Sequence, residues 1–80
     1  MTRKLEARIE TVGEECQIYT TTGDKLATVF MHPDSSAEEM TPEEADAQFE
    51  LFGWERVSDW FKGERGDPWL WYTELEVVEA

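Results

Sequence analysis

The sequence is short of the residues on which several common classes of small protein depend. Its 80 residues include one cysteine, Cys16, and one histidine, His32. A single cysteine excludes an internal disulfide, and these two residues make no Cys/His cluster for a structural zinc site. No apolar run approaches about 18 residues, the length that a membrane-spanning helix requires. We therefore expect a reducing compartment and no disulfide, metal, cofactor or membrane contact.

Leucine, isoleucine, valine and phenylalanine are also scarce. Leu, Ile, Val and Phe make up 16 of the 80 residues, which together with a net charge of -12 is close to the composition of disordered proteins. Four Trp and two Tyr compensate, because each such ring can bury roughly 150 to 250 Å². We expect a single small domain, residues 1–80, with an aromatic-rich core.

Basic residues are also few, and the excess of acidic over basic residues is unevenly distributed along the chain. Residues 1–33 carry four basic and five acidic side chains, a net charge of -1, whereas residues 34–80 carry three and fourteen, a net charge of -11. The stretch 34–50 has seven acidic residues and no Lys or Arg, so its field extends about 8 Å at physiological salt. Direct binding to nucleic acid or to an anionic membrane is disfavoured, because both require clustered cations.

The first part of the chain predicts three strands. Residues 5–11 alternate between apolar and charged side chains, the period of a strand with one dry face. Residues 16–21 and 25–31 are β-branched and aromatic runs around Thr22-Gly23-Asp24, a hairpin signal. We expect a three-stranded antiparallel meander over residues 4–31.

A helix is predicted to begin after Thr41. Thr41 is suited to the N-cap and Pro42 to the first helical position, and Gly53 is a natural C-terminal stop. A helical wheel separates an apolar side from an acidic outer side. The apolar side consists of Ala45, Phe49 and Phe52, and the acidic side of Glu43, Asp46 and Glu50.

The last third of the chain is partly ambiguous. Residues 54–61 fit either a second helix or a strand, whereas residues 62–68 are a loop rich in Gly and charge. Residues 69–77 alternate as a long final strand, with Trp69 and Trp71 on one face and Tyr72 on the other. The pattern predicts an α+β fold: an antiparallel sheet, made of the meander plus a C-terminal strand or hairpin, packed by one amphipathic acidic helix.

Catalysis has weak support, since Cys16 and His32 are the only thiol and the only imidazole. A two-residue loop at Gly23-Asp24 would pair residue 16 with residue 31 and leave His32 on the face opposite to Cys16. A three-residue loop would instead place the two residues opposite each other across the strands. We expect that the protein is not an enzyme, with Cys16 packed as a small hydrophobe.

The acidic stretch is the candidate for binding a partner. Along a helix, residues 43 to 46 rise about 4.5 Å and residues 46 to 50 about 6 Å, comparable to the spacing of phosphates along a nucleic-acid strand. Such a row of carboxylates would fit a protein groove that holds a nucleic-acid backbone. The Lys and Arg residues of a basic protein or nucleoprotein complex would supply the affinity. The candidate residues are Asp34, Glu38, Glu39, Glu43, Glu44, Asp46 and Glu50.

In size, acidity and lack of catalytic motifs, the chain resembles the small acidic inhibitors that phages make against host defence, including anti-CRISPR proteins and DNA mimics. The resemblance implies a stoichiometric inhibitor in the cytoplasm of a host cell, and carries over no residue roles. Small immunity and antitoxin proteins that block nucleases look similar. Residues 51–57, Leu-Phe-Gly-Trp-Glu-Arg-Val, are also similar to a helix-Gly-Trp-Glu-x-Val step in short bacterial and phage domains, which favours a strand after Trp54.

An alternative interpretation is an interaction or assembly module that uses exposed tryptophans. Five large rings lie within 19 residues, and Trp and Tyr dominate interface hot spots. An exposed edge strand or an unburied Trp face would also allow a homodimer. The five rings are Trp54, Trp60, Trp69, Trp71 and Tyr72.

Overall fold

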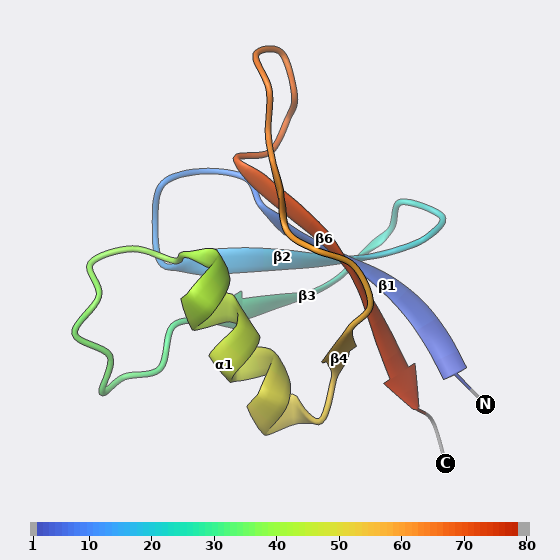
Figure 1. Ribbon diagram of the computed structural model, residues 1–80, viewed down its shortest axis with the longest axis horizontal. Coiled ribbons are helices and arrows are strands. Elements are labelled where there is room, and N and C mark those ends of the chain that lie inside the picture. The colour runs from blue at the N-terminus through green and yellow to red at the C-terminus, as the bar shows by residue number, and fades with distance from the viewer. Residues whose placement is uncertain (1, 79–80) are drawn as a thin grey trace.

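The computed structural model describes residues 2–78, which form one antiparallel sheet of six strands and one short helix (Figure 1). The strand order is β3-β2-β1-β6-β4, and β5 also pairs with β6. No helix in this part of the chain is long and apolar enough to cross a membrane. The elements are β1 (Thr2–Ile9), β2 (Glu15–Thr20), β3 (Lys25–Phe30), α1 (Pro42–Phe52), β4 (Glu55–Arg56), β5 (Phe61–Lys62) and β6 (Trp71–Val78).

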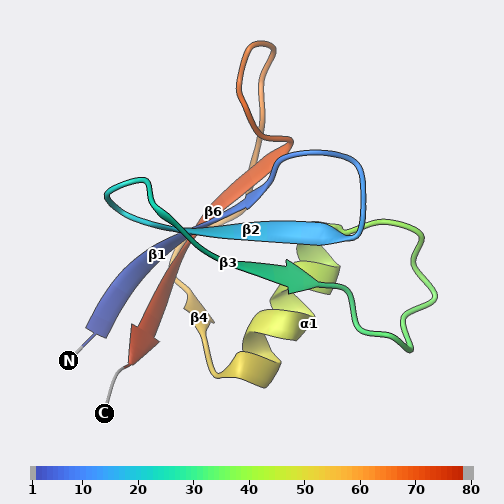
Figure 2. The ribbon, with the colours of Figure 1, turned by 180° about the vertical axis from the view of Figure 1, so that it is seen from behind.

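The predicted meander is confirmed as β1, β2 and β3, with all pairs antiparallel. β6 lies along the other side of β1, in register from Thr2↔Val78 to Ile9↔Trp71. The first and last strands are therefore neighbours in the sheet, and residues 2 and 78 lie opposite each other at one end of it (Figures 1 and 2). The fold is α+β, dominated by the sheet.

The register of the β2–β3 hairpin differs from both loop predictions. Cys16 pairs with Val29, two residues short of the position that a two-residue loop would give. The turn lies earlier in the chain than expected: the Thr20 N–H donates to the Asp24 carbonyl at 2.8 Å, which leaves residues 21–23 in the turn, and the ladder shifts register after Ile18. This shift is a β-bulge-like irregularity, which alternation in sequence does not reveal.

Both helix ends are confirmed. The Thr41 hydroxyl accepts a hydrogen bond from the Glu44 N–H at 3.3 Å, and Pro42 occupies the first turn. At the other end Gly53 has a φ of 76°, a left-handed conformation that glycine adopts without strain, and its N–H donates to the Glu50 carbonyl at 3.1 Å.

The buried apolar side chains form one cluster that draws on β1, β2, β3, β6, α1 and the loop before α1. Phe52, predicted to join it, is 55% exposed and lies beside Trp54, with ring centroids 5.0 Å apart. The reason is its position as the last helical residue, directly before the turn at Gly53. The cluster consists of Leu5, Ala7, Ile9, Cys16, Ile18, Val29, Met40, Ala45, Phe49 and Leu75.

The ambiguous segment 54–61 forms strands and no second helix. β4 and β5 both pair with β6, and the residues between them leave the ladder. Between them, the Val57 N–H still donates to the Glu74 carbonyl at 3.0 Å. The outer side of β6 is therefore lined by two short strands in place of one continuous strand.

The predicted start of the final strand is wrong by two residues. The Leu70 N–H donates to the Ile9 carbonyl, whereas the Leu70 carbonyl accepts from the Gly63 N–H, each at 2.7 Å. In a regular antiparallel strand both groups of one residue face the same neighbour, so the chain twists at Leu70. Trp69 consequently lies beside Tyr72, with ring centroids 5.1 Å apart, and does not share the face of Trp71.

Candidate functional site: an acidic loop and helix

Five of the seven candidate carboxylates are exposed. Three belong to the loop between β3 and α1, which leads back to the start of the helix (Figure 1), and two belong to α1. Residues 43 and 50 are seven positions apart, so they lie on the same side of the helix about 10.5 Å apart along its axis. We call these residues the acidic face: Asp34, Glu38, Glu39, Glu43 and Glu50.

The acidic face carries almost no neutralising charge from the described residues. Its one contact within ion-pair distance joins Asp34 to the Nδ1 atom of His32 at 3.8 Å. The same nitrogen accepts a hydrogen bond from the Asp34 backbone N–H at 3.1 Å. These carboxylates are therefore available to cations of another molecule.

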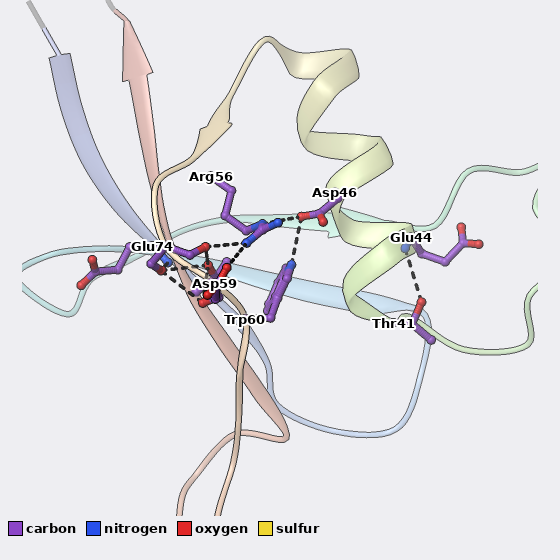
Figure 3. Close-up of polar contacts among 9 residues, drawn as sticks. Thr41, Glu44, Asp46, Arg56, Asp59, Trp60 and Glu74 are labelled. Atoms are coloured by element: carbon purple, nitrogen blue, oxygen red, sulfur yellow. Dashed lines mark hydrogen bonds and ion pairs between the residues drawn. The ribbon is translucent and has the colours of Figure 1, made fainter.

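Asp46 does not belong to this free surface, contrary to the prediction from the helical wheel. Its Oδ1 atom accepts hydrogen bonds from the Trp60 Nε1 at 2.9 Å and from the Arg56 Nε at 3.1 Å (Figure 3). The carboxylate thereby connects α1 to β4 through Arg56 and to the segment between β4 and β5 through Trp60. A wheel reports the direction of a side chain and cannot report which distant segment packs beside it.

Glu44 is also engaged within the protein. Its Oε2 atom accepts a hydrogen bond from the Ser35 hydroxyl at 3.0 Å, and the side chain is half-buried. This contact joins the loop to the first turn of α1, beside the cap at Thr41. Glu44 and Asp46 therefore hold in place the loop and the helix that carry the acidic face.

A shallow hollow lies beside the helix, next to the acidic face. Leu51, which is 69% exposed, contributes apolar surface to it. A bound chain with both basic and apolar side chains would find contacts for each there. The lining residues are His32, Glu44, Ala47, Gln48, Glu50 and Leu51.

The structure forms no nucleophile–base pair from Cys16 and His32. Cys16 is fully buried in β2, and this burial raises the pKa of its thiol to about 12. His32 is exposed beyond the end of β3. Within residues 2–78, no group of three or more His, Cys, Asp or Glu residues could hold a metal ion.

Sequence reasoning missed a cluster around Arg8 on the sheet face opposite the core. The guanidinium carbon lies 4.3 Å from the ring centre of Tyr19 and 5.2 Å from that of Trp69. Nη2 of Arg8 donates to Glu6 at 2.9 Å, and the Tyr72 hydroxyl donates to the same carboxylate at 3.0 Å. Burial, followed by this hydrogen bond, raises the pKa of Tyr72 to about 12. The Nε atom of Arg8 is buried without a hydrogen-bond partner among the described residues.

The four tryptophans are half-buried, and none of them is among the exposed large apolar residues. Trp54, Trp60 and Trp71 pack against the core cluster. The described surface therefore offers carboxylates and phenylalanine rings more readily than tryptophans.

Comparison with protein-family models, with curated proteins and with solved structures finds no match to this chain.

Proposed function

We propose that this protein is a stoichiometric inhibitor that occupies a basic, nucleic-acid-binding surface of a larger protein or nucleoprotein complex. The observation that supports it is the acidic face, five exposed carboxylates in a stretch without Lys or Arg. Carboxylates accept charge-assisted hydrogen bonds from Lys and Arg, as phosphates do. The acidic face would thus compete with nucleic acid for the same cations, in the manner of an anti-CRISPR protein or another anti-defence decoy.

The contacts that fix the loop and the helix carrying the acidic face favour this function. Binding is stronger when the charged groups are positioned before the partner arrives, because less conformational entropy is lost. Asp46 fixes the helix against Arg56 and Trp60, and Glu44 fixes the loop through Ser35. The exposed carboxylates are therefore carried on a backbone that is held at two points.

The test is a charge reversal with a matched control. Glu43→Lys combined with Glu50→Lys changes the net charge by +4 on the acidic face, and Glu55→Lys combined with Glu64→Lys makes the same change at exposed positions outside it. Each tagged protein is used to capture partners from a bacterial lysate at rising salt, followed by mass spectrometry. Circular dichroism checks that both variants remain folded.

We expect the wild type and the control to retain a nucleic-acid-binding protein that the Glu43/Glu50 variant loses. Moderate salt should release it, because association driven by exposed charges weakens as ionic strength rises. The wild-type protein should also displace nucleic acid from the purified partner when the two proteins are present at a 1:1 ratio. Equal retention by all three proteins, or retention that survives about 1 M salt, would contradict the proposal.

The tryptophan-based alternative receives less support from the structure. Its rings are half-buried, and the exposed aromatic side chains are Phe30, Phe52 and Phe61. An immunity-type nuclease inhibitor would use the same acidic face and differs only in its target. The capture experiment distinguishes these cases by the identity and the salt sensitivity of the partner.

A further inference from the structure

The hollow beside α1 contains a polar side chain without a partner in the described part of the chain. Gln48 is 8% exposed, yet its side-chain amide makes no hydrogen bond with any group in residues 2–78. An amide offers two N–H donors and a carbonyl acceptor, and buried polar groups of native proteins are nearly always hydrogen-bonded. Gln48 lines the hollow, so a group bound there would supply the missing partner.

The wall of the hollow follows the repeat of the helix. Glu44, Gln48 and Leu51 are separated by four and three positions, so they lie along one side of α1 over about 10.5 Å of its axis. Figure 3 shows Glu44 on the side of α1 opposite Asp46, away from the contacts that join the helix to β4. β3 ends beside the helix (Figure 2), and His32, two residues after this strand, also lines the hollow.

The two ends of the hollow differ in polarity. Glu44 and Gln48 form the end nearer the start of α1. The Oε2 atom of Glu44 accepts from the Ser35 hydroxyl, and its Oε1 atom has no hydrogen-bond partner among the described residues. At the other end Ala47 and Leu51 are exposed and supply apolar surface. The hollow thus offers a carboxylate and an amide oxygen at one end and a leucine at the other.

Charge selects a cation as the occupant. Glu44 and Glu50 both line the hollow, and neither forms an ion pair within residues 2–78. They belong to the stretch 34–50, which has seven acidic residues and no Lys or Arg, so an anion would be repelled.

Arginine fits this hollow better than lysine does. Its guanidinium is more weakly hydrated than an ammonium group, so less hydration is lost when it enters a half-buried position. The group carries several N–H donors in one plane, so it binds a carboxylate and an amide oxygen at the same time. Its methylene stem packs on apolar surface, such as that of Leu51.

We propose that the hollow beside α1 binds one arginine side chain of the partner protein. The guanidinium donates to Glu44 Oε1 and to the Gln48 carbonyl oxygen, its stem lies against Leu51, and the exposed Glu50 attracts the cation. The inference rests on the proposed function and names the group by which the basic partner is held. It also gives a reason for a glutamine at a buried position, where an unsatisfied amide costs stability.

Blocked amino acids test the hollow without a partner protein. The probe is N-acetyl-arginine methylamide, and the lysine and citrulline derivatives are its controls, since citrulline has the shape of arginine without the charge. Each is titrated at constant ionic strength, and ¹H–¹⁵N NMR spectra follow the backbone amides and the side-chain NH₂ of Gln48. A single side chain in a shallow hollow predicts a dissociation constant of about 1 to 10 mM.

Three variants locate the binding. Gln48→Met removes the amide at nearly constant size. Glu44→Gln removes the charge and keeps an acceptor for Ser35, whereas Glu43→Gln removes one charge from the same helical turn outside the hollow. We expect the first two to weaken arginine binding about fivefold and the control to change it less than about twofold. Gln48→Met should keep its urea midpoint, because the amide loses no hydrogen bond.

We expect the arginine derivative to shift the side-chain signal of Gln48, and the lysine and citrulline derivatives to bind at least about fivefold more weakly. No shift at Gln48 up to about 50 mM, well above the expected dissociation constant, would overturn the proposal. So would equal binding of lysine or citrulline, or equal binding of arginine by Gln48→Met. A loss in Glu43→Gln as large as that in Glu44→Gln would show a general effect of charge and would also refute it.

These outcomes are distinguishable from those of the proposed function. If arginine binds in the hollow and the lysate capture retains no nucleic-acid-binding protein, the decoy function is wrong and the arginine site stands. If such a protein is captured equally by the wild type and by Gln48→Met, the arginine site is wrong and the decoy function stands.

Discussion

The edge of the sheet at β3 is one continuous strand with a single register shift, whereas the edge at β4 and β5 is interrupted between the two strands. At the interrupted edge the Ser58 hydroxyl accepts the Glu74 N–H at 3.1 Å, a group that would otherwise face a ladder partner. The buried Thr73 hydroxyl donates to the Ser58 carbonyl at 3.0 Å. Side chains have here taken the place of a strand along this part of β6.

The interrupted edge is also tied to the helix, and the β3 edge has no comparable attachment along its start. Arg56 bonds both the Ser58 carbonyl, at 2.6 Å, and the Asp46 carboxylate. Trp60 bonds the same carboxylate and stacks on Phe49, with ring centroids 6.1 Å apart. The comparison teaches that the interrupted edge is held by polar side-chain contacts to α1. The β3 edge is held by its ladder with β2, by the Thr28–Gln17 hydrogen bond and by the packing of Val29 in the core.

The largest effect is expected from Gly63→Ala, which should break the interrupted edge. A Cβ atom at residue 63 would lie 1.9 Å from the Trp69 carbonyl oxygen, so the backbone would have to move. We expect a loss of about 3 kcal/mol in the free energy of unfolding, measured by urea denaturation. Gly13→Ala, where nothing lies within 4 Å, is the control and should change stability by about 0.5 kcal/mol. Equal midpoints would show that residues 63 and 69 are not in close contact.

Asp46→Ala should release the interrupted edge from the helix. It removes the hydrogen-bond acceptor of Trp60 and Arg56. Hydrogen bonds to charged groups contribute roughly 1.5 to 3 kcal/mol, and this site is partly exposed. We therefore expect the free energy of unfolding to fall by about 1.5 kcal/mol. Glu50→Ala, on the exposed side of the same helix, should be nearly neutral. Urea unfolding followed by tryptophan fluorescence measures both, and a Glu50 variant as unstable as the Asp46 variant would contradict this role.

Alkaline pH should weaken the side of the sheet that contains β2 and β3. Burial raises the pKa of Cys16 from 9.0 to about 12, so above pH 9 the unfolded chain loses a proton that the folded chain keeps. The free energy of unfolding should then be unaffected by this group below pH 9 and fall by about 1.4 kcal/mol per pH unit above it. Urea denaturation between pH 7 and about pH 11 measures the slope.

Cys16→Ala should remove most of that slope between pH 9 and pH 10. Above pH 10 Tyr72 adds its own decrease, because its pKa is also raised, to about 12, and Tyr72→Phe should remove that part. A slope that Cys16→Ala leaves unchanged would show that the thiol is accessible in the folded protein. Reaction of the native thiol with a disulfide reagent at pH 8 gives the same information about opening of the sheet between β2 and β3.

The smallest effect is expected from Ser58→Ala at the interrupted edge. It leaves the Glu74 N–H without its side-chain acceptor, and we expect a loss of about 1 kcal/mol. Ser36→Ala, in the exposed part of the loop before α1, is the control and should be silent. If Ser58→Ala also raises the tendency to associate, measured by sedimentation, then its hydroxyl protects the edge as well as stabilising it.

Local patterns were enough to predict the strands and the ends of the helix. Alternation over residues 5–11 and the residues at Thr41 and Gly53 act within a few positions of the chain, and the structure confirms the meander and both helix ends. The excess of negative charge in residues 34–50 follows from the absence of Lys and Arg there, which is visible in the sequence. The decoy function and its partner stay proposals.

The side of Trp69, the hairpin register and the role of Asp46 could not be predicted in this way. Trp69 changes face because the backbone twists at Leu70, between partners in β1 and at Gly63. Asp46 is engaged by a tryptophan fourteen residues along the chain. Each of these features depends on which segments pack together, and a pattern within one segment carries no information about that.

The sequence by itself determined where the charge lies, which residues alternate and where the helix starts and ends, because composition and hydrogen bonds over a few residues decide these. Only the tertiary structure decided which carboxylates are free, which aromatic rings are exposed and which edge of the sheet is left open. These depend on contacts between distant residues, such as the hydrogen bond from Tyr72 to Glu6 across 66 positions. The order of the strands brings such residues together.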